Sequence, residues 1–141
     1  MSTSTHAHTA PATRGQCVAI DLSAKIAAID GYWQPRVVAE MNDYQFKVVR
    51  IKDEFIWHTH SDTDETFIVL DGELRIDFRN GPSGDGSIVL RAGQMAVVPK
   101  GIEHKPCAHT EVKLLLIEPR GVVNTGDGSS NERTVLNDQW I

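Results

Sequence analysis

Hydrophobic and polar residues alternate with a period of two over much of this chain, which is typical of β-strands. The alternation is cleanest over 73–79, where Leu74, Ile76 and Phe78 would share one face and charged residues the other. A strand of this kind is half exposed and belongs to an antiparallel sheet. Further strands are expected, in chain order, over residues 37–41, 44–51, 56–60, 66–70, 88–90, 95–98 and 112–117.

Turn residues separate these segments. Lys52-Asp53-Glu54 is expected to end the strand over 44–51, and Asp71-Gly72 predicts a hairpin. Short strands at regular spacing, separated by glycine and proline, indicate an all-β sandwich or barrel rather than alternating strands and helices.

One short helix is expected ahead of the strands. Apolar residues have helical spacing over 22–29. Asp21 or Ser23 could cap its first turn, and Gly31 would end it. The segments 66–70 and 114–117 are apolar on both faces, so either this helix or a partner subunit must cover their outer side.

Length and composition limit the class of protein. At 141 residues the chain is expected to form one domain with its own core. Its net charge of -5, with no cluster of Lys and Arg, argues against a nucleic-acid or membrane surface. No apolar run could span a bilayer, and residues 1–15 lack the apolar stretch of a secretory signal. Cys17 and Cys107 are too few for a disulfide framework, although a single bridge is left open, and they fit a reducing cytosol. We therefore expect a cytoplasmic protein.

Three regions follow from these patterns. Residues 1–15, rich in Ser, Thr and Ala, are expected to be a disordered tail. Residues 16–120 form the domain. The polar segment 121–141 is a C-terminal tail, whose apolar Trp140 and Ile141 are expected to dock onto the body or onto a partner subunit.

Candidate chemistry is concentrated in a few histidines and one glutamate. His58 and His60 are two residues apart, so on a strand both side chains would point to one face. With Glu65 and His104 they make three imidazoles and a carboxylate, a set suited to one divalent transition metal. Four such ligands leave one or two positions open on a six-coordinate ion, for substrate, oxygen or an activated water. Iron, manganese, nickel and zinc are not distinguished.

The spacing of these residues resembles the two motifs of the cupin superfamily. The first motif is matched by His58-Thr59-His60, Glu65 and Gly72, and the second by Gly93, Pro99, Gly101 and His104. The resemblance covers about residues 37–118. The chain departs from the family at Lys52, where a glycine is usual, and at Ala108, where an asparagine is usual. Neither position is a metal ligand in the family.

The resemblance implies an architecture and an assembly. It implies a cupin-type jelly-roll barrel of roughly six to eight strands with the metal near its centre. It also implies a homodimer, often with edge strands exchanged between subunits.

Four further residues are candidates for the pocket wall. Phe67 and Val69 share the strand face of Glu65 and would give the pocket apolar walls. Lys47 and Arg50 lie on opposite faces of the strand over 44–51, so one of them would face the pocket and could meet an anionic substrate.

Two tryptophans and one histidine are expected elsewhere. Trp57 should point away from the metal if His58 points towards it. Trp33 is expected in the core or at an interface, and His109 in solvent.

Three functions fit these features. The first is a metal-dependent enzyme that isomerises, epimerises or eliminates on a small oxygenated substrate of the sugar or carboxylate type. The second is a non-heme Fe(II) dioxygenase with the same ligands. The third is a cupin that binds a metal or a small ligand without catalysis.

Overall fold

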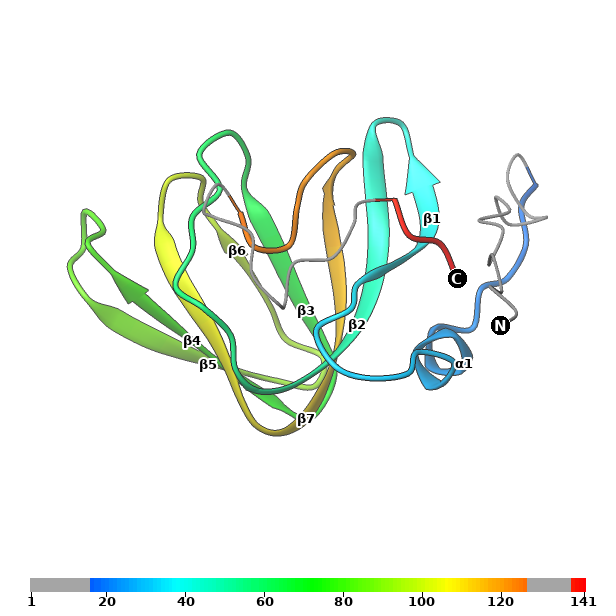
Figure 1. The fold of residues 1–141 in the computed structure, drawn as a ribbon, viewed down its shortest axis with the longest axis horizontal. Helices are drawn as coiled ribbons and strands as arrows, with labels where there is room; N and C mark the ends of the chain where they lie inside the picture. Colours follow the sequence, from blue (N-terminus) through cyan, green and yellow to red (C-terminus); the bar gives the residue numbers. More distant parts are fainter. Residues whose placement is uncertain (1–15, 127–137) are drawn as a thin grey trace, which may run out of the picture.

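The computed structural model describes residues 16–126 and 138–141, and the tail expected over 1–15 lies outside them. Figure 1 shows one short helix and a set of antiparallel strands that curve around a common interior. The predicted all-β class is therefore confirmed. In chain order the elements are α1 (Leu22–Ala27), β1 (Arg36–Met41), β2 (Tyr44–Glu54), β3 (Glu65–Asp71), β4 (Glu73–Arg79), β5 (Gly86–Arg91), β6 (Met95–Val98) and β7 (Glu103–Pro119).

The long strand β7 organises the sheet. Its first part, 103–107, pairs with β4, whose other edge carries β5. Its second part, 112–119, lies between β2 and β3, so the strand order there is β1-β2-β7-β3-β6. The first residues of β7 therefore lie beside β4, and its last residues lie between β2 and β3.

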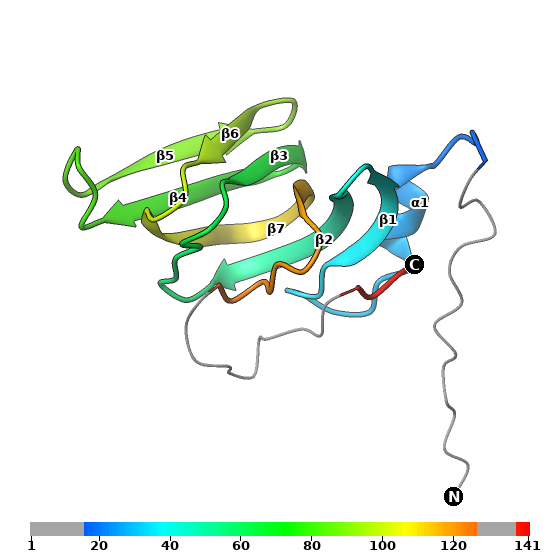
Figure 2. The same cartoon turned by 90° about the horizontal axis from the view of Figure 1, so that it is seen from above.

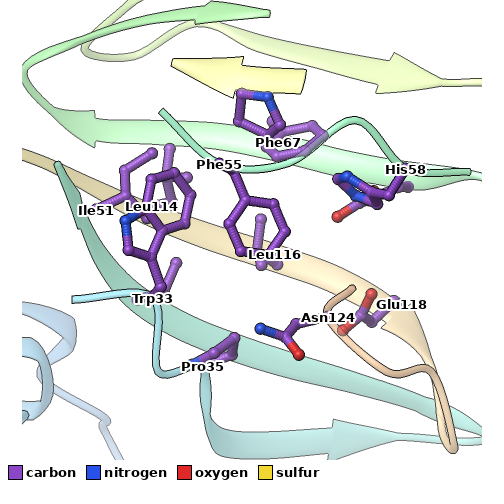
Figure 3. Close-up of a pocket in the computed structure, with 13 residues that line it drawn as sticks. Trp33, Pro35, Ile51, Phe55, His58, Phe67, Leu114, Leu116, Glu118 and Asn124 are labelled. Atoms are coloured by element: carbon purple, nitrogen blue, oxygen red, sulfur yellow. The ribbon is translucent and has the colours of Figure 1, made fainter. Parts of the chain in front are cut away.

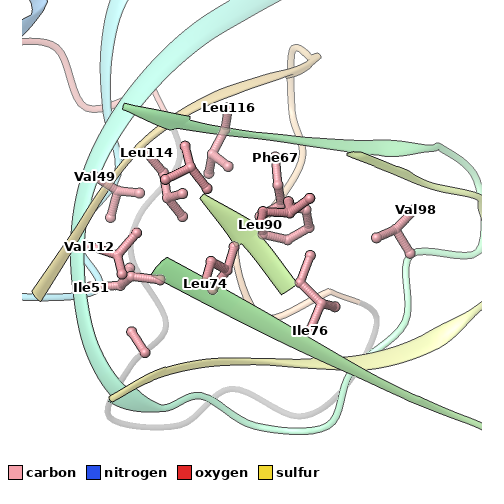
Figure 4. Packing of buried hydrophobic residues seen from close by; sticks show 12 residues of the cluster. Val49, Ile51, Phe67, Leu74, Ile76, Leu90, Val98, Val112, Leu114 and Leu116 are labelled. Atoms are coloured by element: carbon pink, nitrogen blue, oxygen red, sulfur yellow. The ribbon is translucent and has the colours of Figure 1, made fainter. Parts of the chain in front are cut away.

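The inner faces of the strands form the main core (Figure 4). The alternation expected for β4 is observed, since Leu74 and Ile76 are fully buried while Glu73 and Arg75 are exposed. The buried members of this core are Val49, Ile51, Phe67, Val69, Leu74, Ile76, Leu90, Val98, Ala108, Val112, Leu114 and Leu116.

A second apolar cluster lies on the outside of the sheet. Ile26 and Ile29, at and just after α1, pack with Val38 and Val48, and partly buried side chains of β3 and β7 join them. Figure 2 shows α1 lying against β1 on this side. The helix therefore covers apolar outer positions of the sheet, which was one of the two expected arrangements. Asp21 caps it, accepting a hydrogen bond from the Ala24 amide.

The last residues of the chain lie along β1. The Val37 amide donates to the Gln139 carbonyl (2.7 Å), and the Ile141 amide donates to the Val37 carbonyl (3.1 Å). Trp140 is the parallel bridge partner of Val37, and Ile141 packs on the outer cluster. This segment covers part of the edge of β1 that would otherwise be open.

Several expected boundaries were wrong. β2 does not end at Ile51 but continues to Glu54. A bulge between Ile51 and Asp53 accommodates the polar residues, and Asp53 has φ 69°. β7 begins at Glu103 rather than at 112. The helix ends at Ala27, before Gly31.

The segment 56–60 is not a strand. It forms only an isolated bridge between His58 and His104. The two cysteines are free, Cys17 at the surface and Cys107 buried. Within the described ranges, no helix has the length and hydropathy needed to cross a membrane.

Candidate metal centre

The four predicted ligands meet in the interior. His58 and His60 come from the loop before β3, Glu65 is the first residue of β3, and His104 is the second residue of β7. Each is at most 6% exposed, and one ligand atom from each lies within 4.8 Å of all the others. Residues up to 46 positions apart in the chain are therefore brought to one point by the pairing of this loop with β7.

Backbone pairing positions the two bridging histidines. The His58 amide donates to the His104 carbonyl (3.0 Å) and the His104 amide to the His58 carbonyl (2.9 Å). Each ring is also held by a carbonyl two residues earlier: His58 Nδ1 lies 3.0 Å from Ile56 O, and His104 Nδ1 lies 2.9 Å from Ile102 O. An imidazole that donates from Nδ1 keeps its lone pair on Nε2. Both Nε2 atoms are thus set up as ligand atoms.

Glu65 stands at the centre of the group. Its Oε2 lies 2.9 Å from the Nε2 atoms of His60 and His104, and 3.8 Å from that of His58. Burial alone would raise the pKa of Glu65, but its contacts to His104, His58 and His60 outweigh that effect and hold the pKa well below the ordinary value. The carboxylate is therefore ionised at neutral pH.

This arrangement fits a bound cation. Both ring nitrogens of His104 face acceptors: Nδ1 lies 2.9 Å from Ile102 O and Nε2 lies 2.9 Å from Glu65 Oε2. A neutral imidazole has one N–H and can donate to only one of them, and a cation bound between Nε2 and the carboxylate removes this conflict. His58 Nε2 is buried and has no hydrogen-bond partner among the described residues. A divalent transition metal ligated by three Nε2 atoms and one carboxylate oxygen would satisfy all these atoms.

A small apolar cavity of about 40 Å³ opens beside the group (Figure 3). That is room for a few water-sized atoms, since one water needs roughly 10–15 Å³ on this measure. His58 and Glu65 contribute to its lining, and the other lining residues are Trp33, Pro35, Val49, Ile51, Phe55, Phe67, Pro106, Leu114, Leu116, Glu118 and Asn124.

An aromatic pair forms part of this wall. Trp33 stacks on Phe55, with ring centroids 4.6 Å apart, and its Nε1 donates to the Lys52 carbonyl (2.9 Å). Trp33 has φ 62°, a backbone conformation that is uncommon for a bulky residue. Phe55 in turn meets the His58 ring edge-on at 5.3 Å. The wall is thus in contact with a ligand side chain.

Of the four residues predicted to line the pocket, only one contributes to the wall of the cavity. Phe67 lines the cavity, whereas Val69 lies in the main core away from it. Lys47 is buried and pairs with Glu118 at 2.8 Å, so its charge is already matched. Arg50 lies on the opposite face of β2, where it pairs with Glu111 at 3.0 Å. Neither basic residue lines the cavity beside the ligands.

Trp57 lies outside this site, under the guanidinium of Arg79 at 4.2 Å. Trp33, Phe55, Glu118 and Asn124 line the cavity and were not predicted to do so. Glu118 could have been found from sequence, because it continues the alternation of Leu114 and Leu116. The other three lie outside the strands and the sequence gives no periodic signal for them.

Comparison with known proteins identifies the family. Residues 47–118 match the Cupin domain family. The chain belongs to the cupin family. A crystal structure of a cupin-2 domain containing protein from Shewanella frigidimarina NCIMB 400 is 52% identical, covers 72% of this chain and 94% of its own, and superposes with a TM-score of 0.67. The jelly-roll architecture implied by the two motifs is thereby confirmed.

Two other proteins are similar to this chain at lower sequence identity. "Uncharacterized protein YdbB" of Bacillus subtilis is 36% identical over 81 residues, which is 57% of this chain and 68% of that protein. Hydroquinone 1,2-dioxygenase from Sphingomonas sp. TTNP3, solved with 4-hydroxybenzoate bound, is 20% identical with a TM-score of 0.59, covering 70% of this chain and 73% of its own. The latter likeness concerns the fold alone.

Proposed function

We propose that this cupin is a mononuclear metal enzyme that uses oxygen to oxidise a small, largely apolar substrate bearing an oxygen donor. The observation that carries the proposal is the apolar cavity that ends at His58 and Glu65. A divalent metal held by His58, His60, Glu65 and His104 would supply open positions for dioxygen and for the substrate oxygen. Hydroquinone 1,2-dioxygenases have the same fold, so the fold is compatible with such chemistry.

The charges around the cavity disfavour the sugar-type substrate of the first sequence hypothesis. Among the described residues, no Lys or Arg lines the cavity, and its wall carries two carboxylates, Glu65 and Glu118. Glu118 is already paired with Lys47, so a phosphate or carboxylate group in the cavity would have no cation to pair with other than the metal itself. An apolar molecule with a hydroxyl or keto oxygen directed at the metal avoids this cost.

A second candidate function is proton transfer, as in isomerisation or elimination. Glu118 lines the cavity, and burial raises its pKa, with Lys47 acting in the opposite direction and Glu65 in the same direction. A carboxyl group with a raised pKa next to a metal could act as a general base or acid. This residue is the one observation that favours the second candidate.

Oxygen consumption separates the two candidates. The protein is purified without added metal, stripped with a chelator and reloaded without air with Fe(II), Mn(II), Ni(II) or Zn(II). Each form is then mixed with a panel of small phenols, enols, diketones, sugars and keto acids while dissolved oxygen and products are followed. The proposed function predicts oxygen uptake that requires both Fe(II) and a member of the apolar part of the panel.

Two other outcomes of this experiment would favour a different function. Conversion of a substrate in the absence of oxygen would favour proton transfer, and Glu118→Gln would then lower the rate at unchanged metal content. Stable metal occupancy with no conversion of any compound would favour a non-catalytic binding cupin.

A further inference from the structure

The segment 122–126 lies beside the loop that carries His58 and His60. It follows β7 and forms a turn in which the Gly126 amide donates to the Val123 carbonyl (2.9 Å). Asn124 from this segment lines the cavity, and Figure 3 shows it near Glu118 and Pro35. Thr125 is only 1% exposed and is packed into the body, whereas Val123 is 36% exposed.

Gly126 makes the closest approach between this segment and the ligand loop. It has φ +69°, and a Cβ added there would overlap the Thr59 carbonyl oxygen, lying 3.1 Å from the Thr59 carbonyl carbon and 3.3 Å from Cδ2 of the His58 ring. The overlapping atoms are backbone, which cannot rotate away as a long side chain could. Only glycine therefore fits between the segment and the loop.

The ligand loop has little regular structure of its own. It is also held by the bridge between His58 and His104 and by the hydrogen bond from the Gly101 amide to the His60 carbonyl (2.8 Å). Thr59 lies between the two ligand histidines and faces Gly126 with its carbonyl. A shift of Thr59 would therefore move both neighbouring imidazoles.

We propose that the segment 122–126 is a brace for the metal centre, and that Gly126 is a positioning residue for His58 and His60. The proposal rests on the metal site proposed above. The brace fixes the Thr59 peptide in addition to the bridge, and so keeps the two Nε2 atoms at the separation that one ion requires. Metal sites tolerate only small displacements of their ligands, and changes to groups that support ligands commonly lower metal affinity about 10–100-fold.

The test compares two glycine substitutions. Gly126→Ala introduces the overlap, whereas Gly84→Ala places alanine at a similar φ of +79° where a Cβ would meet nothing within 4 Å. Both variants carry a similar backbone strain, so the difference between them reports mainly the contact with the ligand loop. Co(II) affinity is measured by competition with a chelator, and the visible absorption of bound Co(II) reports the ligand geometry. Thermal unfolding in the presence of chelator measures fold stability separately.

We expect Gly126→Ala to lose at least about tenfold in Co(II) affinity and to change the Co(II) spectrum, and Gly84→Ala to keep both. Affinity and spectrum equal to wild type in Gly126→Ala would overturn the brace while leaving the metal site intact. Failure of the wild-type protein itself to bind Co(II) would overturn the metal site and the brace together.

A second measurement needs no variant. Coupling between two sites is reciprocal. If the brace reduces the motion of the ligands, metal binding should in turn reduce local opening of the brace. We expect Zn(II) to slow amide hydrogen exchange in the peptide covering 122–126, and to leave the loop over 80–85 unchanged. Slower exchange in 56–60 with no change in 122–126 would overturn the proposal, even where Gly126→Ala does not fold.

Discussion

Two backbone carbonyls determine which ring nitrogen of His58 and of His104 is available as a metal ligand. Ile56 O and Ile102 O accept from the Nδ1 atoms, so the Nε2 atoms are left to face Glu65. The motif spacing predicted which residues meet, but not these carbonyls, because the segment 56–60 is not a strand and its backbone conformation has no periodic signature. At the scale of single residues, the sequence thus predicted which four residues meet, but not how their rings are oriented.

The buried pair of Lys47 and Glu118 gives a prediction about stability. Both side chains are buried and their charged atoms are 2.8 Å apart. Removing one partner leaves the other charge buried without its match, which typically costs about 3–5 kcal/mol. We expect Lys47→Met to lower the free energy of unfolding by that amount, measured by urea denaturation at neutral pH.

The double variant Lys47→Met/Glu118→Leu is the control for this pair. Replacing both charges by apolar groups of similar size removes the unmatched charge, so it should recover most of the loss. A double variant as unstable as the sum of the two single variants would contradict the interpretation.

At the scale of elements, the hairpin between β3 and β4 depends on one glycine. Gly72 has φ +90°, and a Cβ there would lie 2.7 Å from the Glu111 carbonyl oxygen of β7. The glycine of the first cupin motif is therefore required both by the turn and by the close approach of β7. The sequence indicated the turn, whereas the approach of β7 depends on contacts between distant segments.

Gly72→Ala should therefore destabilise the fold more than Gly93→Ala. Gly93 has φ +84° with open space around it, so its substitution adds only backbone strain, about 1–2 kcal/mol. Gly72→Ala adds the overlap with Glu111 to a similar strain. The urea midpoints of the two variants measure the difference, and equal midpoints would show that the close approach does not matter.

Clean alternation and turn residues located β4 and β6 with their observed bounds. The expected break at 52–54 was wrong because polar residues can be accommodated in a bulge, and the start of β7 was missed because 103–111 contains many polar residues. In both places the pairing partner, rather than the local sequence, decides the length of the strand.

For the whole molecule, the arrangement of the sheet leaves apolar side chains on an edge strand. Met95 and Val97 of β6 are 56% and 52% exposed, and β6 is the last strand in the order β1-β2-β7-β3-β6. Exposed apolar edges of this kind are commonly covered by a partner. The homodimer implied by the cupin resemblance stays a prediction, and this edge is where we expect it to form.

Sedimentation velocity tests the dimer. We expect a species of twice the 15.6 kDa chain mass, and its loss in Val97→Lys, which places a charge on the edge. Lys100→Ala, a change at an exposed turn residue, is the control and should leave the mass unchanged. A wild-type protein that sediments as a monomer at all concentrations would contradict the prediction.

Metal content shows whether His58, His60, Glu65 and His104 hold one divalent metal. Elemental analysis after reloading and removal of free metal should give about one equivalent in the wild-type protein and in His109→Ala, whose histidine lies outside the site. His58→Ala and His104→Ala should retain less than about a tenth of that, with their β-sheet circular dichroism preserved. Full metal retention in both of these variants would contradict the account.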